Sequence, residues 1–240
     1  MSNNSRDSPE LKALKRRIQI MGLSALVFAG SYAGLSAYKN QKFDELARDF
    51  PVYVTQFEDE YGKFREKPKL VFGRLRSAEG GRVGGRSLDG KLYDDSTIFI
   101  NDDLTSFTHY LLFESAQGAG YHRIILKHEL AHLVENQIIK NIYSQMDSSD
   151  KWLYINQGVI VAPKERKKQA IAICEGLAEY ISLQQSGREI PSIFYEKHYN
   201  FVKPVIDKFG LKGGIKKMLF SPPTETELDN PHNYYKSIGI

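Results

Sequence analysis

The segment at residues 128–135, HELAHLVE, places two histidines four positions apart, with a glutamate directly after the first. It lies in a longer stretch, residues 121–142, whose apolar residues recur at the spacing of an α-helix. Residues four apart on a helix lie on the same face, one turn above the other. The segment therefore predicts a helix that presents the imidazoles of His128 and His132 to one point.

Two imidazoles that face a common point are a start on a tetrahedral Zn²⁺ site. Glu129 is offset by one residue around the helix, so its carboxylate can reach a metal-bound water without binding the metal, as a general base does. This pattern arises by chance in about 1% of chains of such composition. A surface helix that carries it by chance is the alternative. The apolar flanks favour a partly buried helix instead, in which imidazoles need polar partners.

A catalytic zinc needs a third protein ligand, and residues 174–180, CEGLAEY, offer one. Glu175 and Glu179 are four apart on one helical face, where like charges repel. Their spacing is explained if Glu175 binds the cation and Glu179 accepts the second ring N–H of a histidine, for which we choose His128.

Gly176 lies inside this predicted helix, which extends from about residue 163 to residue 186 and is capped by Gly187. A glycine inside a helix costs about 1 kcal/mol relative to alanine. We expect a close approach to the helix of His128 to explain that cost, with Ala131 and Ala178 keeping the helix crossing tight.

HELAH followed by EGLAEY resembles the gluzincin zinc metallopeptidases of the peptidase MA-like group, across residues 121–186. The resemblance implies an α+β, mainly helical zincin-like domain with a small β-sheet packed on the active-site helix. In that fold an edge strand binds the substrate backbone, and STIFIN, residues 96–101, is expected to be that strand. Glu179 stands where the family often has aspartate. The resemblance implies these roles: His128, His132 and Glu175 as zinc ligands, Glu129 as general base and Glu179 as the group that orients a ligand.

The N-terminal part of the chain differs in composition from the rest. Residues 18–38 contain no charged residue, and a basic cluster precedes them. A helix of this length can cross a bilayer core of roughly 30 Å, so we predict a single transmembrane anchor. A cleaved signal peptide and a buried core helix are the alternatives. The denser positive charge before the segment puts the N-terminal tail, residues 1–17, in the cytoplasm and the predicted catalytic domain, residues 39–240, outside it.

The other segments carry weaker patterns. Residues 40–65 have helical spacing that Pro51 is expected to break. Residues 69–75 resemble a β-strand, residues 77–91 are rich in glycine and predict a loop or hairpin tip, and residues 104–117 have a helical or mixed pattern.

The charge and the cysteine content limit which binding partners and covalent cross-links the chain can have. The net charge of +4 is mild and no basic-aromatic platform is present, so we expect no nucleic acid partner. Cys174 is the single cysteine, which excludes an intramolecular disulfide. We expect it to be a small buried residue rather than a nucleophile or a ligand.

The prediction is a membrane-anchored zinc metallopeptidase that hydrolyses a peptide or protein substrate. A catalytically silent binding or assembly module on the same fold is the alternative, and a self-processing or tightly gated protease is a third possibility. The group that stabilises the oxyanion is left open, because packing explains each downstream candidate as well. These candidates are Tyr180, His198, Tyr199, Tyr234 and Tyr235.

Overall fold

The computed structural model describes residues 9–75, 80–86, 92–103, 121–146, 151–156, 159–187 and 195–240. The chain divides into two compact units, Met1–Glu45 and Leu46–Ile240. Helices predominate, and a three-stranded sheet accompanies them, which confirms an α+β fold.

Helix α1, Pro9–Tyr61, passes through Pro51 without interruption, so the predicted break there is wrong. Proline inside a helix costs about 3 kcal/mol because it lacks a donor and crowds the preceding turn. Val54 and Phe57, in the following turns, are buried at 9% and 0% exposure. Packing of this part of the helix offsets the local cost, as tertiary contacts commonly do for helices.

The uncharged segment at residues 18–38 falls inside α1, but the side chains of residues 9–31 lie outside the described part of the chain. No helix in the searched part is both long and apolar enough to span a bilayer. The transmembrane anchor stays a prediction.

The sheet consists of β1 (Lys69–Gly73), β2 (Gly81–Arg86) and β3 (Leu92–Asn101), in the order β1-β3-β2. Strand β3 pairs parallel with β1 and antiparallel with β2. Two sequence-based expectations are therefore wrong. STIFIN belongs to the central strand rather than to an edge, and part of the expected loop at residues 77–91 is a strand.

Strand β2 carries little side-chain pattern, because its sequence is GRVGGR. Its pairing with β3 shifts register between Val83 and Gly85, and Gly84 and Gly85 have φ of 58° and 87°. Glycine tolerates such positive φ, which allows the bulge. Backbone pairing, rather than alternating apolar residues, holds this strand in place.

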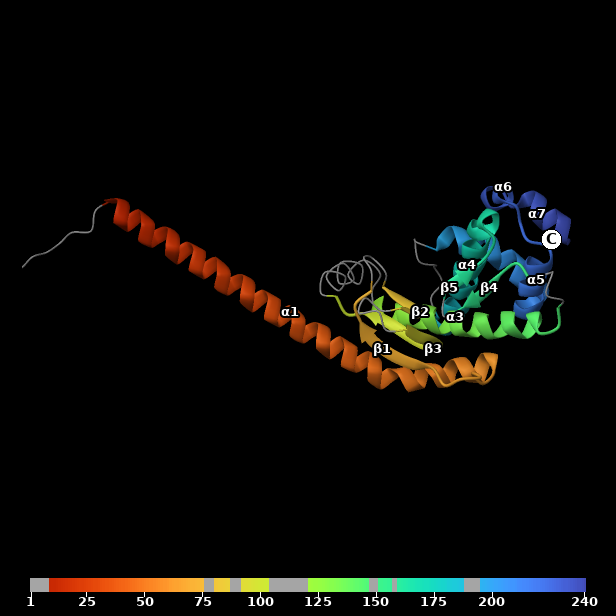
Figure 1. Ribbon diagram of the computed structural model, residues 1–240, viewed down its shortest axis with the longest axis horizontal. Helices are drawn as coiled ribbons and strands as arrows, with labels where there is room; N and C mark the ends of the chain where they lie inside the picture. The colour runs from red at the N-terminus through yellow and green to blue at the C-terminus, as the bar shows by residue number, and fades with distance from the viewer. Residues whose placement is uncertain are drawn as a thin grey trace, which may run out of the picture. The chain divides into compact units, whose positions relative to one another are not determined.

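Three helices form the rest of the core: α3 (Tyr121–Tyr143), α4 (Lys167–Ser186) and α5 (Glu196–Phe220). Helix α4 packs against both α3 and α5, while the sheet lies against α3 (Figure 1). Helix α4 ends at Gly187 in the left-handed conformation, as its sequence predicts. The most deeply buried apolar residues include Ile98, Ile100, Leu126, Leu130, Ile173, Leu177 and Ile181.

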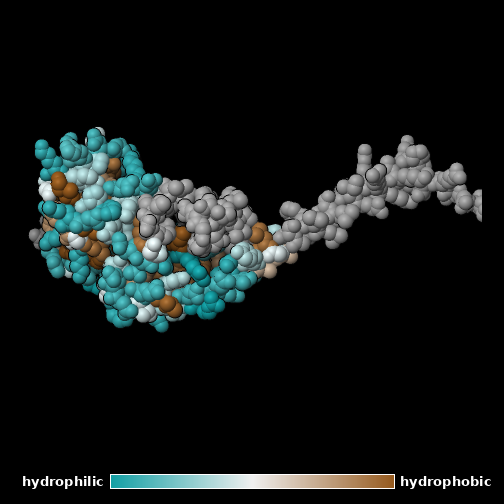
Figure 2. All heavy atoms as spheres, turned by 180° about the vertical axis from the view of Figure 1, so that it is seen from behind, coloured by the Kyte–Doolittle hydropathy of each residue, from teal (hydrophilic) through white to brown (hydrophobic). Residues whose placement is uncertain are grey.

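Short elements complete the fold. They are β4 (Tyr154–Asn156), β5 (Val159–Val161), the 3-10 helix η2 (Lys164–Arg166), α6 (Glu225–Asp229) and α7 (His232–Ile238). Hydrophilic residues cover most of the described surface on the face drawn in Figure 2. The helical or mixed pattern expected at residues 104–117 lies outside the described residues.

Candidate metal centre

The structure brings together three residues from two packed helices. His128 and His132 come from α3 and Glu175 comes from α4, and one potential ligand atom of each lies within 4.8 Å of the others. His128 is buried, and the side chains of His132 and Glu175 are 15% and 23% exposed. Two imidazoles and one carboxylate at this distance could hold a metal ion.

His128 places its two ring nitrogens against different carboxylates. Its Nε2 lies 3.2 Å from Glu175 Oε2, and its Nδ1 lies 3.3 Å from Glu179 Oε2. Glu179 is 1% exposed and belongs to the buried face of α4. The contact between His128 and Glu179 is the one expected from their positions on the two helices.

His132 has a similar arrangement with a different partner. Its Nε2 lies 3.7 Å from Glu175 Oε2, and its Nδ1 lies 3.0 Å from Oε2 of Glu135. Glu135 is fully buried and stands three residues after His132 on α3. Reasoning from the sequence missed Glu135, although a glutamate three residues after a predicted histidine ligand on the same helix is a signal that could have pointed to it.

The carboxylates change the titration of both histidines. Burial alone would lower the pKa of His128, but its contacts with Glu175 and Glu179 raise this pKa to about 9. Burial likewise opposes the charge on His132, and Glu175 and Glu135 raise its pKa well above the ordinary value. Burial tends to raise the pKa of Glu175, yet the two histidines hold it below its usual range. The cluster thus attracts positive charge strongly.

Glu129 directly follows His128 on α3, and its side chain lies against strand β2 of the sheet. Glu129 is 7% exposed. A Cβ added to Gly81 of β2 would lie 2.9 Å from Cγ and 3.0 Å from Oε1 of Glu129. Only a residue without a side chain lets β2 approach Glu129 so closely. An edge strand of the sheet, β2, therefore lies against Glu129, whereas the sequence predicted that residues 96–101 would be the substrate-binding edge strand.

One aromatic residue that the sequence did not single out lies against His128. The ring of Tyr195 stacks on that of His128, with centroids 4.4 Å apart and planes 12° from parallel. Tyr195 directly precedes α5.

Two of the tyrosines considered from the sequence have other hydrogen-bond partners. Tyr180 donates to Asp207, and Tyr235 donates to the carbonyl oxygens of Asn200 and Phe201. These contacts fit the packing roles that the sequence left open.

Gly176 does not approach α3, so the expectation for this residue is wrong. A Cβ on Gly176 would meet the backbone oxygen of His198 at 2.5 Å and Cγ2 of Val202 at 2.7 Å, both on α5. The preceding residue, Glu175, contacts the histidines of α3. Two successive residues of α4 therefore contact different helices, Glu175 contacting α3 and Gly176 contacting α5. Cys174 is buried as expected, and burial raises the pKa of its thiol.

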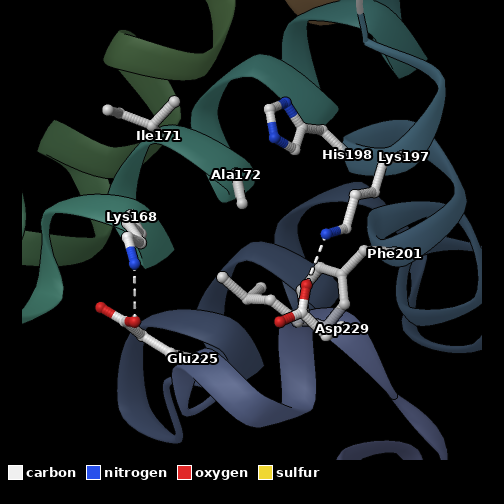
Figure 3. A pocket seen from close by; sticks show the side chains of 9 residues that line it. Lys168, Ile171, Ala172, Lys197, His198, Phe201, Glu225 and Asp229 are labelled. Carbon is white, nitrogen blue, oxygen red and sulfur yellow. Dashed lines mark hydrogen bonds and ion pairs between the residues drawn. The ribbon is translucent and has the colours of Figure 1, made fainter.

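A cavity of about 270 Å³ lies between α4, α5 and α6. Ile171 and Phe201 contribute apolar walls, and the ion pairs Lys168–Glu225 and Lys197–Asp229 flank it (Figure 3). None of the three clustered residues lines this cavity, so it is separate from the candidate metal centre.

Comparison of the chain with protein-family models, with curated proteins and with solved structures gives no match.

Proposed function

We propose that this protein is a zinc metallopeptidase of the gluzincin type. The observation that carries the proposal is the convergence of His128, His132 and Glu175 from two packed helices. Three protein ligands that leave a further coordination position open are typical of catalytic zinc sites, whereas structural sites use four.

The donor set fits zinc by its chemistry. Imidazole nitrogen and carboxylate oxygen are both ordinary zinc ligands, and the second ring nitrogen of each histidine faces a buried carboxylate. Such carboxylates select the ring tautomer that leaves Nε2 available for a metal. Because the cluster is largely buried, few water molecules can reach it to compete with these residues for the metal.

A zinc ion held there would supply a Lewis acid for a water molecule and for a substrate carbonyl. Glu129 serves as the general base, since it directly follows His128 on α3, is buried and is not one of the three proposed ligands. It takes a proton from the attacking water and passes that proton to the departing amine. Glu179 orients His128 throughout.

Strand β2 is the substrate-binding element in this proposal. It pairs with β3 on one side, and no other described strand pairs with it. An extended peptide can add to such an edge through backbone hydrogen bonds. Gly81 brings this strand against Glu129, so a peptide bound there has its backbone near the general base.

The location of the enzyme is part of the proposal. The uncharged segment at residues 18–38 would anchor the chain in a membrane, with the catalytic unit outside the cytoplasm. The substrate is then a peptide or a protein that reaches that side of the membrane.

The first experiment measures zinc in the purified chain of 240 residues, solubilised in mild detergent, beside its Glu175→Ala and Glu129→Gln variants. We expect one zinc per chain in the parent, little in Glu175→Ala and full zinc in Glu129→Gln. Peptide hydrolysis should be present in the parent and absent from both variants. Full zinc in Glu175→Ala would refute the ligand assignment.

A parent that binds zinc but cleaves no peptide, in a broad substrate library, would favour the silent binding or assembly module instead. A parent that takes up no zinc would remove the proposed centre altogether.

A further inference from the structure

The two histidines of the candidate metal centre are supported from different helices. The carboxylate that faces His128 Nδ1 belongs to Glu179 on α4, whereas the carboxylate that faces His132 Nδ1 belongs to Glu135 on α3 itself. Both imidazoles turn their Nε2 atoms towards the same oxygen, Glu175 Oε2. The two supporting carboxylates therefore hold equivalent positions around the centre.

Burial makes the placement of Glu135 informative. Its side chain is 0% exposed, compared with 15% for that of His132. A carboxylate removed from water costs several kcal/mol unless it is paired and hydrogen-bonded. The contact of 3.0 Å with His132 Nδ1 provides such a partner. A leucine or methionine would fill the same space without that cost, so the carboxylate needs a reason beyond packing.

The helix supplies the geometry for this contact. Residues three apart on a helix are neighbours, and long side chains lean towards the N-terminal end, so Glu135 reaches back to His132 within one turn. Because both residues belong to α3, this contact does not depend on how α4 docks. The contact between His128 and Glu179 does depend on it.

We propose that Glu135 is a positioning residue that accepts the Nδ1–H of His132 and holds its Nε2 towards the metal. This inference rests on the proposed zinc centre and deepens it. Outer carboxylates that hold a ligating histidine typically contribute 10–100-fold to metal affinity. Glu135 and Glu179 then act together, each on one histidine.

The test uses the chain of 240 residues in mild detergent and measures the zinc dissociation constant by competition with a chelator. Glu135→Leu removes the acceptor and keeps an apolar side chain of similar size. Glu135→Gln keeps an acceptor oxygen and removes the charge. Asn136→Leu is the matched control, because Asn136 is the next residue, is equally helical and is 5% exposed.

We expect the dissociation constant to rise about 10–100-fold in Glu135→Leu and less than about tenfold in Glu135→Gln, with Asn136→Leu within about twofold of the parent. The visible spectrum of the Co²⁺-substituted protein should change in Glu135→Leu and not in the control. Unchanged zinc affinity in a folded Glu135→Leu would overturn the positioning role while leaving the zinc centre intact. Absence of zinc binding in the parent would instead overturn the proposed function, and this inference with it.

A measurement on the parent protein tests the proposal even if the Glu135→Leu variant does not fold. In the zinc-loaded parent, nitrogen NMR of His132 should show a proton on Nδ1 that exchanges slowly, with Nε2 bound to the metal. Binding through Nδ1 would overturn the proposal.

Discussion

Replacing Gly176 with alanine tests the packing that positions Glu175. The added Cβ would lie 2.5 Å from the backbone oxygen of His198 and 2.9 Å from its backbone carbon. Because these are backbone atoms, no rotamer change can relieve the contact, and α4 must move from α5 by about 1 Å to restore ordinary van der Waals distances. Overpacking of this kind costs about 1–3 kcal/mol.

Alanine also favours a helix over glycine, by about 1 kcal/mol, which offsets part of that cost. We therefore expect Gly176→Ala to lower the free energy of unfolding by up to about 2 kcal/mol, which corresponds to a fall in Tm of up to about 8 °C for a domain of this size. Zinc affinity should fall as well, since Glu175 is the adjacent residue on the helix that moves.

Chemical and thermal unfolding of the chain of 240 residues, followed by circular dichroism, measures the effect. Gly213→Ala is the control, because Gly213 lies in α5 after the kink at Gly210, and its nearest neighbour is a side-chain atom rather than backbone, Phe209 Cβ, at 3.3 Å. The control should be neutral or slightly stabilised. A Gly176→Ala variant that is more stable than the parent by about 1 kcal/mol, as at an unhindered helical glycine, would refute the close approach of α4 to α5.

Four further predictions concern pH, strand β2 and the packing around α5. In the metal-free protein the pKa of His128 is raised to about 9. Its positive charge therefore stabilises the fold fully below pH 6.5, by about 3 kcal/mol, and this stabilisation is lost as the pH rises towards 9. Urea unfolding across this pH range measures the loss. Zinc affinity should increase over the same range, because zinc binds the neutral imidazole, and a calorimetric titration would show it. Gly81→Ala should displace Glu129 and reduce peptide hydrolysis at least tenfold while zinc content is retained, and loss of zinc would contradict this. Trp152→Phe should lower the free energy of unfolding by about 1–3 kcal/mol, because the indole N–H of Trp152 donates to the Leu219 carbonyl oxygen at 2.7 Å. An unchanged urea midpoint would contradict this prediction.

Local spacing determined much of the candidate site. The four-residue interval between His128 and His132 is sufficient to put both imidazoles on one face of a helix, whatever surrounds that helix. The same rule puts Glu175 and Glu179 on one face of α4. The pairing of Glu179 with His128 could also be expected, because a histidine ligand commonly has a carboxylate behind it.

Tertiary structure decided the features that depend on distant parts of the chain. Whether Gly176 faces α3 or α5 depends on how three helices cross, and the periodicity of α4 is the same in either case. Strand β2 is held by backbone pairing to β3, so its glycine-rich sequence carries no apolar alternation that would predict it.

The same reason explains Glu135 and Tyr195. A glutamate on a helix is usually solvated, and only the packing of α3 buries this one beside His132. Tyr195 reaches His128 because of where the chain enters α5. The sequence by itself thus determined which residues could share a helical face, since helical geometry is local. The folded structure decided which faces meet, since burial and close contact depend on residues far apart in the chain.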